Sequence, residues 1–353
     1  MSLADTRMIG VSINNLTGIT GHSYGLDEMV RAAREAESLG FDGVWVHDAP
    51  FGRRTMASYD SVSILAAIAG CTTILKLCTG ILQPHLRNPV ALALSWATLH
   101  GLSGGRAIMG VGTGAGKGTL VNRQYEALAA LRHKTDLDPS AIYHDRGRLF
   151  VECLEIMNRL WREDKISHHG EFFQFDEVTL GEARPATPPP TLMGSGIYVP
   201  KEYGGPAHHL WSKENAGRFL LGRYKRIVNL SDGWLANHTT PQEYDDSWAR
   251  IEAYAAQRAP GKKYAKAYNC FVNVNDDRDV ARNEAADFLN KWHTMIADDV
   301  VDRWVVAGPA NEVAAQLREY QARGITIFQL VVASPDQFGQ MRRIGEEVLP
   351  VLT

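Results

Sequence analysis

The chain has 353 residues, with 37 Lys and Arg against 40 Asp and Glu and a formal net charge of -3 at pH 7. This balance argues against a nucleic-acid-binding protein, because such domains are normally basic and carry a basic patch. The first residues lack the pattern of a signal peptide and no stretch reaches the roughly 18 apolar residues of a membrane helix, so we expect a cytoplasmic protein with no membrane partner.

Short apolar strands alternate with helices along the whole chain. Strands are expected at Met8–Asn14, Gly43–Val46, Leu75–Leu82, Ala107–Val111, Thr191–Met193, Gly233–Ala236, Ala267–Val274 and Thr326–Val332. Helices, with apolar residues at three- and four-residue spacing, are expected at Leu26–Leu39, Pro89–Leu102, Tyr143–Trp161, Arg278–Met295, Pro309–Ala322 and Gln337–Val348. Eight strands in this order predict one (β/α)8 TIM-barrel domain over residues 1–353.

Two long connections interrupt the barrel pattern, at 115–142 after the fourth strand and at 196–222 after the fifth. Loops of this length are usually functional or disordered. The second contains Tyr198, Tyr203 and Trp211, an aromatic content that favours a lid or a subunit contact over a disordered tether.

The ends of two strands carry the most informative residues, because ligands of βα barrels bind beyond the carboxyl ends of the strands. Gly80 interrupts the third strand, where an interior glycine marks a bulge or a close approach by a backbone or a ligand. Gly112, Thr113 and Gly114 end the fourth strand with bare backbone and one hydroxyl. A bulge followed by a flexible loop is the alternative interpretation.

Cysteines and histidines do not indicate a metal site. The four cysteines are widely spaced without a Cys-x-x-Cys pair, which predicts buried free thiols. The adjacent histidine pairs at 168–169 and 208–209 would point to opposite faces of a strand, and no zinc-binding helix motif is present. The chain also lacks the nucleophile elbow of α/β hydrolases and the Walker A loop.

Four blocks, taken in order, resemble the bacterial luciferase-like family of flavin and deazaflavin oxidoreductases. They are Leu26–His47, Leu77–Gly114, Ser231–Trp234 and Gly308–Leu330. The resemblance covers nearly the whole chain and implies a TIM barrel with a flavin-type cofactor, FMN or coenzyme F420, at the barrel mouth. It also implies a homodimer formed through helices that follow early strands, for which 62–68 and 89–99 offer apolar residues.

The same resemblance implies which residues bind the cofactor. The Gly80–Ile81 peptide matches the position of a non-proline cis bond in the family, and Thr113 and Gly114 match a cofactor-contacting pair. Gly194, Ser195 and Gly196 match the glycine-rich phosphate-binding position, with a plain turn as the alternative.

Asp48 and His47 are the candidate catalytic residues. By the same resemblance, the position of Asp48 looks like that of a catalytic histidine in the FMN-dependent relatives, whereas deazaflavin enzymes tend to carry aspartate there. Asp48 therefore favours F420 and is also a candidate cofactor ligand. Ala49 and Ala115 stand where the deazaflavin sugar-phosphate dehydrogenases have a histidine and a glutamate, so their acid–base machinery does not carry over and glucose 6-phosphate is disfavoured. His47 could supply a proton, unless it lies on the outer face of its strand.

These observations predict an oxidoreductase that transfers a hydride between F420, or reduced FMN, and a small organic substrate. An FMN-dependent monooxygenase that uses O2 is the close alternative. A non-catalytic flavin-binding protein is a second alternative, because Ala49 and Ala115 remove two family side chains. An unrelated barrel without a flavin is a third.

Overall fold

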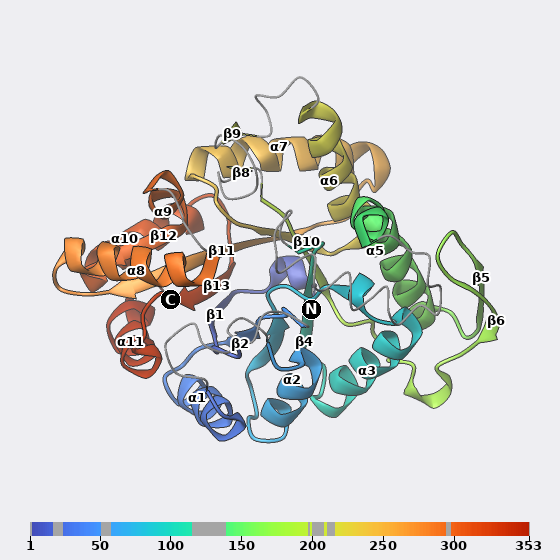
Figure 1. Cartoon of the computed structure of the whole chain (residues 1–353), viewed down its shortest axis with the longest axis horizontal. Helices are drawn as coiled ribbons and strands as arrows, with labels where there is room; N and C mark the ends of the chain where they lie inside the picture. Colours follow the sequence, from blue (N-terminus) through green and yellow to red (C-terminus); the bar gives the residue numbers. More distant parts are fainter. Residues whose placement is uncertain are drawn as a thin grey trace.

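The computed structural model describes residues 2–16, 24–50, 58–114, 139–196, 198–199, 208–209, 216–293 and 298–352. Within these residues, eight parallel strands close into a barrel that helices surround (Figure 1). Around the barrel the strands are β1 (Met8–Ser12), β2 (Gly43–Val46), β3 (Lys76–Thr79), β4 (Ala107–Val111), β7 (Thr191–Gly194), β10 (Gly233–Ala236), β11 (Ala265–Val274) and β13 (Ile327–Val332). Pairing of β10 with β11 and of β13 with β1 closes the circle, which confirms the predicted (β/α)8 fold.

Helices connect these strands in the order expected of βα units. They are α1 (Leu26–Ser38), α2 (Ser61–Ala69), α3 (Pro89–Leu102), α5 (Pro139–Arg162), α6 (Ala216–Leu230), α7 (Pro241–Arg258), α8 (Arg278–His293), α9 (Asp298–Trp304), α10 (Ala310–Gln321) and α11 (Gln337–Arg343). At the start of α3, Asn88 Oδ1 accepts from the backbone N–H groups of Val90 and Ala91, and Pro89 occupies the first helical position.

Several short elements were not predicted. They are the hairpin of β5 (Ile166–His169) and β6 (Gln174–Val178), the pair of β8 (Tyr198–Val199) and β9 (His208–His209), and β12 (Val305–Gly308), which extends the sheet beside β11. The hairpin strands are polar and mostly solvent-facing, so they lack an apolar period. On β5 the side chain of His168 is 13% exposed and that of His169 is 64% exposed, so the adjacent rings do face opposite ways.

Most of connection 115–142 and much of connection 196–222 lie outside the described residues. The lid or subunit-contact prediction for Tyr198, Tyr203 and Trp211 concerns side chains that are not described, and it stays a prediction.

Apolar side chains fill the barrel below its mouth. Trp45, Ile108, Leu192 and Ile327 point inward from different strands, and Leu3 of the short helix η1 (Leu3–Asp5) joins them. A larger cluster fills the layer between the strands and the helices. The barrel is therefore a packed support, and polar chemistry is left to its open end.

The four cysteines are free thiols, of which those at 78, 153 and 270 are buried and that at 71 is partly exposed. Burial raises the pKa of the Cys78 and Cys270 thiols, so both stay protonated. The described residues hold no group of three His, Cys, Asp or Glu side chains placed to bind a metal ion. Among the described helices, none has the length and hydrophobicity needed to cross a bilayer.

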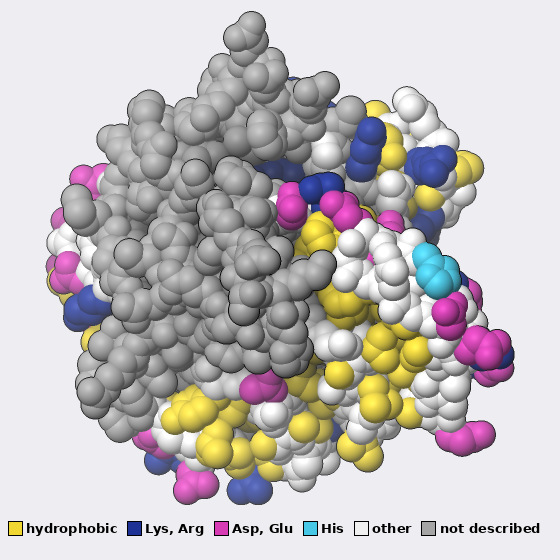
Figure 2. Space-filling model, turned by 45° about the vertical axis from the view of Figure 1, so that its right-hand side comes forward, with side chains coloured by type: hydrophobic (Ala, Val, Ile, Leu, Met, Phe, Trp, Pro, Cys, Tyr) yellow, Lys and Arg dark blue, Asp and Glu magenta, His cyan; other side chains and the backbone are white. Residues whose placement is uncertain are grey.

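Helix α3 is mostly apolar, although only part of it is buried. Trp96 is fully buried, whereas Leu94 is 44% exposed and Leu102 is 79% exposed. Figure 2 shows hydrophobic side chains gathered over the lower part of the face that includes this side of the barrel. Exposed hydrophobic side chains that gather on one face can mark an interaction surface.

Candidate active site

A bulge shapes the carboxyl end of β3. Leu77 pairs with Ala107 and Leu82 bridges to Val111, so the β3 side has one residue more than β4 between these pairs. The extra residue falls at Gly80 and Ile81, and the peptide bond between them is cis, as the family resemblance implied. The bulge predicted from the interior glycine is therefore present.

The Ile81 side chain lies over two glycines from neighbouring strands. A Cβ at Gly112, after β4, would lie 2.4 Å from Ile81 Cδ1, and a Cβ at Gly194, on β7, would lie 2.5 Å from Ile81 Cγ2. Both distances are too short for packed carbon atoms. The glycines at the ends of β4 and β7 thus make room for a side chain of this protein, and the three strand ends form one continuous surface.

A polar side chain from β13 supports the bulge from inside the barrel. Gln329 is buried in an otherwise apolar strand, and its Nε2 donates to Ser12 Oγ at 3.1 Å and to the Gly80 carbonyl at 3.4 Å. A Cβ at Gly80 would lie 2.2 Å from Gln329 Oε1. Position 80 therefore requires glycine, because the buried amide of Gln329 occupies the space that a Cβ would need.

His47 faces the barrel interior. Trp45, two residues earlier, points into the interior cluster, and the Nδ1 atom of His47 lies 3.0 Å from the Gly80 carbonyl oxygen. The alternative that His47 lies on the outer face of its strand is wrong. Because a carbonyl oxygen can only accept, this contact favours the tautomer with the proton on Nδ1. Asn15 holds the backbone here: it donates to the His47 carbonyl and accepts from the His47 N–H, at 2.7 and 2.8 Å.

Burial lowers the pKa of His47 to about 4, against a smaller opposing effect of the Gly80 hydrogen bond. Between the unfolded pKa near 6.5 and this value, only the unfolded chain binds the proton, so stability falls as the pH falls through this window. The free energy of unfolding of the parent protein should therefore fall by about 2 kcal/mol between pH 7 and pH 5 because of His47, and His47→Asn should abolish this part of the change. Urea unfolding followed by tryptophan fluorescence at both pH values measures it.

The control is the parent protein, unfolded under the same conditions at both pH values. An unaltered pH dependence in His47→Asn would show that His47 accepts a proton in the folded protein as readily as in the unfolded one.

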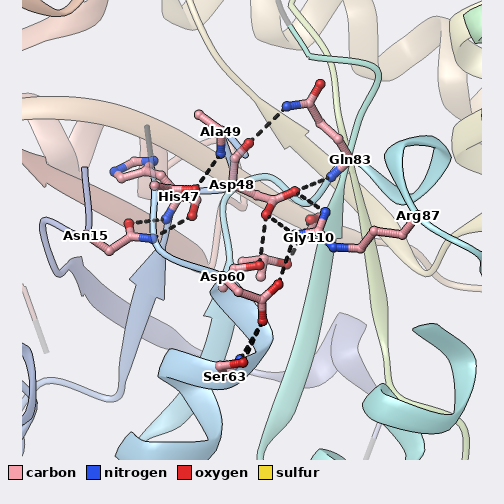
Figure 3. Close-up of polar contacts among 12 residues, drawn as sticks. Asn15, His47, Asp48, Ala49, Asp60, Ser63, Gln83, Arg87 and Gly110 are labelled. Atoms are coloured by element: carbon pink, nitrogen blue, oxygen red, sulfur yellow. Dashed lines mark hydrogen bonds and ion pairs between the residues drawn. The ribbon is translucent and has the colours of Figure 1, made fainter. Parts of the chain in front are cut away.

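The Asp48 carboxylate is fully buried and receives four hydrogen bonds (Figure 3). Arg87 binds it through both terminal nitrogens, Nη2 to Oδ1 at 2.7 Å and Nη1 to Oδ2 at 2.8 Å. Ser61 Oγ donates to Oδ1 at 3.1 Å and the Gln83 N–H donates to Oδ2 at 3.0 Å. A carboxylate has about four acceptor positions, so these four donors occupy it completely.

Arg87 links Asp48 to a second carboxylate. Its Nη2 also donates to Oδ1 of Asp60, the N-cap of α2, at 3.1 Å. Burial alone acts to lower the pKa of Arg87, but attraction to Asp48 and Asp60 outweighs it and raises the pKa. The ends of β2 and β3 and the start of α2 are therefore fixed by one charged cluster.

This geometry gives Asp48 a positioning role first. Its carboxylate fixes the N–H of Gln83, while the Gln83 side chain donates to the Asp48 carbonyl at 2.9 Å. Gln83 in turn supports the next strand end, because a Cβ at Gly114, where φ is 72°, would lie 2.2 Å from Gln83 Oε1. Direct contact of Asp48 with a cofactor or a catalytic water stays a prediction.

The end of β7 is the predicted phosphate-binding position. Trp234 Nε1 donates to the carbonyl and the hydroxyl oxygen of Ser195, at 2.9 and 3.1 Å. The Gly196 carbonyl accepts from Arg223 Nη1 on α6, and a Cβ at Gly196 would lie 2.7 Å from Asn237 Oδ1. A positive charge thus adjoins the glycine-rich turn. Phosphate binding at Gly194, Ser195 and Gly196 stays a prediction.

Two buried polar atoms at the mouth suit a bound ligand. Within the described part of the chain, Asn14 Nδ2, which follows β1, and Asn237 Oδ1, which follows β10, are buried without a hydrogen-bond partner. A buried polar group left unsatisfied costs about 1–3 kcal/mol. Together with the apolar surface at Ile81 and the half-exposed Thr113, these atoms fit a flat ring with polar edges.

Several residues of this site were not predicted as functional. Gln83, Arg87 and Gln329 organise three strand ends, and Asn15 fixes the backbone of His47. Gln329 left a signal in the sequence, since a single amide in the apolar run IFQLVV points to a buried partner. Arg87 left no such signal, because its partner Asp48 is 39 residues away.

Known proteins share this fold across nearly the whole chain. The profile of the family described as luciferase-like monooxygenase matches residues 8–199. An F420-dependent glucose-6-phosphate dehydrogenase of Intrasporangium calvum is 25% identical over 340 residues, 94% of this chain and 97% of that protein. A structure of an F420-dependent secondary alcohol dehydrogenase with an F420–acetone adduct superposes with a TM-score of 0.74 at 20% identity, covering 99% of both chains. The FMN complex of the oxygenating constituent of 3,6-diketocamphane monooxygenase of Pseudomonas putida gives a TM-score of 0.67 at 15% identity, covering 98% of both chains.

Proposed function

The chain belongs to the luciferase-like monooxygenase family, and from this premise we propose that it is an F420-dependent oxidoreductase. It transfers a hydride between coenzyme F420 and a small organic substrate at the barrel mouth. The full-length similarity to proteins named as F420-dependent dehydrogenases supports this choice of cofactor. Asp48, by its resemblance to the deazaflavin enzymes, points the same way.

The observation that carries the proposal is the single surface formed by three strand ends. Ile81 covers Gly112 and Gly194, and His47 faces the same interior. This surface is apolar at its centre and has buried polar atoms at its edge, which is what a flat tricyclic ring requires.

Each predicted site residue has a role in this proposal. Ile81 supports the face of the ring, Thr113 and Gly114 contact its polar edge, and Gly194, Ser195 and Gly196 bind the phosphate. His47, neutral at pH 7 because burial lowers its pKa, accepts or donates the substrate proton through a ring nitrogen. Asp48 holds the ends of β2 and β3 in place. When bound, a deazaflavin ring supplies hydride acceptance and donation, and the protein supplies orientation and exclusion of water.

A side-by-side titration of the purified protein with coenzyme F420 and FMN, followed by cofactor fluorescence, tests the proposal. We expect tight binding of F420 and, with a panel of secondary alcohols, a substrate-dependent loss of the oxidised deazaflavin absorbance. Preference for FMN would replace the proposal with an O2-using monooxygenase. Tight F420 binding without any substrate-dependent redox change would favour a non-catalytic binding protein, and binding of neither would refute a cofactor site.

We propose that two copies of the chain pair through the apolar side of α3. The exposed Leu94 and Leu102 lie on this helix, and a second copy would remove them from water. Leu102→Glu is expected to convert a dimer into a monomer in analytical ultracentrifugation, because a charge would be buried at the contact. Val280→Glu is the control, since Val280 is 50% exposed on α8. An unchanged mass for Leu102→Glu would place the contact elsewhere.

We also propose that residues 1–353 form one domain and that the protein works in the cytoplasm. Closure of the barrel joins β1 to β13, so the first and last parts of the chain share one sheet. The free thiols at 78, 153 and 270 suit a reducing compartment.

A further inference from the structure

Asn14, which directly follows β1, is a buried asparagine whose side-chain amide is only half used. The residue is 6% exposed, and its Oδ1 accepts a hydrogen bond from the Leu16 N–H at 3.1 Å. Because a backbone N–H can only donate, this contact fixes which side of the amide is the oxygen, and Nδ2 points the other way. Nδ2 is buried and has no hydrogen-bond partner within the described part of the chain. An unsatisfied buried donor destabilises the folded protein, so a ligand that accepts from Nδ2 would recover this free energy.

The Asn14 side chain faces the barrel interior. Side chains alternate along a strand, and Ser12, two residues earlier, accepts from the buried amide of β13 inside the barrel. Pairing of β1 with β2 continues to Ile13, whose N–H donates to the Trp45 carbonyl at 2.9 Å. Asn14 therefore stands at the level of His47, on the neighbouring strand end.

Asn15 fixes Asn14 relative to His47. Beyond Ile13 the Asn15 side chain takes over from the backbone, donating to the His47 carbonyl at 2.7 Å and accepting from the His47 N–H at 2.8 Å. The ring of His47 is oriented from its other side, since Nδ1 lies 3.0 Å from the Gly80 carbonyl oxygen. A hydrogen-bond donor on β1 and the proposed proton acceptor on β2 are thus held at adjacent strand ends.

Asn14 lies on the half of the mouth that the proposed cofactor surface does not use. That surface is formed by the ends of β3, β4 and β7, whereas β1 follows β2 on the other side of β3. Along the sheet, β1 is roughly 10 Å from β3 and roughly 14 Å from β4 at the usual strand spacing. Asn237 Oδ1, which is also buried without a partner among the described residues, lies instead beside Gly196 of the β7 turn. Asn14 is therefore placed to meet the substrate, and Asn237 the cofactor.

The side chains around Asn14 on this half are apolar. Leu16 belongs to a buried apolar cluster with Val331 and Ala333 of the β13 end. Ala49, which follows β2, packs against the same cluster. A ligand here meets one hydrogen-bond donor in an apolar wall, which suits an uncharged molecule with one oxygen on a hydrocarbon skeleton.

We infer that Asn14 Nδ2 binds the oxygen of an uncharged alcohol and of the ketone or aldehyde derived from it. The inference rests on the proposed function, because it names the substrate class of that same site. In the oxidation, the alcohol loses a hydride from its carbinol carbon to oxidised F420 and its hydroxyl proton to His47, while the C–O single bond becomes a carbonyl. Asn14 donates to this oxygen throughout and stabilises the negative charge that develops on it as the proton leaves.

Binding of cyclohexanone, which oxidised F420 cannot reduce, tests the inference without turnover. Ligand-observed NMR titration gives its dissociation constant for the cofactor-free protein and for the protein saturated with oxidised F420. Asn14→Asp keeps an acceptor for the Leu16 N–H and replaces the Nδ2 donor by an oxygen. We expect this variant to bind cyclohexanone about 10- to 100-fold more weakly and F420 within about twofold of the parent. Asn229→Asp, the same change at an exposed asparagine of α6, is the matched control and should alter neither affinity.

A second variant and a spectroscopic readout separate ligand binding from a structural role. The hydroxyl of Asn14→Ser can still accept from the Leu16 N–H but is too short to reach the ligand, so this variant should lose the same binding even where Asn14→Asp folds poorly. In infrared difference spectra of carbonyl-¹³C cyclohexanone, the parent should lower the carbonyl stretching frequency through the Asn14 hydrogen bond. Both variants should return it toward the value of the unbonded ketone.

The outcomes distinguish this inference from the proposed function. Parent-like cyclohexanone affinity in both variants, or a parent that does not bind the ketone, would overturn the inference. Weaker F420 binding with unchanged ketone binding would make Asn14 a cofactor ligand and would also overturn it. Ketone binding that depends on Asn14 in a protein that does not bind F420 would keep the oxygen site and refute the proposed cofactor.

Discussion

Replacing Arg87 by Leu is expected to lower the free energy of unfolding by about 3–5 kcal/mol, because it leaves a buried carboxylate without its partner. The Asp48 side chain has no exposed surface, and Arg87 supplies two of its four hydrogen bonds. Replacing Asp48 by Asn in the Arg87→Leu background should recover part of this loss, since it removes the uncompensated charge. Urea unfolding of the three proteins measures both effects.

The same substitution, Arg87→Leu, should also weaken cofactor binding. Asp48 fixes the Gln83 N–H, and Gln83 supports the turn at Gly114, so release of the Asp48 carboxylate should loosen the predicted cofactor edge. We expect F420 affinity of Arg87→Leu to fall under conditions where the variant remains folded. Arg148→Leu is the control: it also removes an arginine that pairs with two carboxylates, but its side chain is 60% exposed. Exposed pairs contribute about 0–1 kcal/mol, so equal losses in the two variants would contradict the buried-pair argument.

The second large effect is expected where Ile81 lies over the strand-end glycines. Gly112→Ala or Gly194→Ala should each cost about 1–3 kcal/mol of stability, because the added Cβ overlaps the Ile81 side chain. Each should also weaken F420 binding, since Ile81 is displaced toward the space proposed for the ring. Thermal unfolding and the fluorescence titration measure the two consequences.

A double-mutant cycle isolates this contact from other effects of the substitutions. Ile81→Ala removes the Cδ1 atom that the new Cβ would overlap and leaves only the Gly194 carbonyl oxygen at 3.2 Å, so Gly112→Ala should cost less in that background. The matched control is Gly101→Ala on α3, where a Cβ would meet nothing within 4 Å. This substitution should stabilise the helix by up to about 1 kcal/mol, because alanine favours the helix more than glycine does. Additive effects of Ile81→Ala and Gly112→Ala would show that the contact does not set the need for glycine.

Local sequence patterns were sufficient to predict the barrel and the position of its mouth. β2, β4, β10 and α3 begin and end at the predicted residues, because each is an apolar run bounded by glycine, proline or a cap. The bulge at Gly80 was also predicted, since an interior glycine often marks a bulge or a close approach. The hairpin β5–β6 and the short β12 were not, because their residues pair beside other segments without an apolar period of their own.

The sequence by itself determined the (β/α)8 fold and which strand ends carry unusual chemistry, because hydrophobic period and glycine placement act over a few residues. Tertiary structure alone decided what these residues contact. Asp48 meets Arg87 across 39 residues, Gly80 meets Gln329 across 249, and Arg226 of α6 reaches Gly147 of α5. Such pairs form when strands and helices distant in the chain close around one barrel. Whether an aspartate titrates or fixes a loop depends on how many donors surround it, and no local pattern records that number.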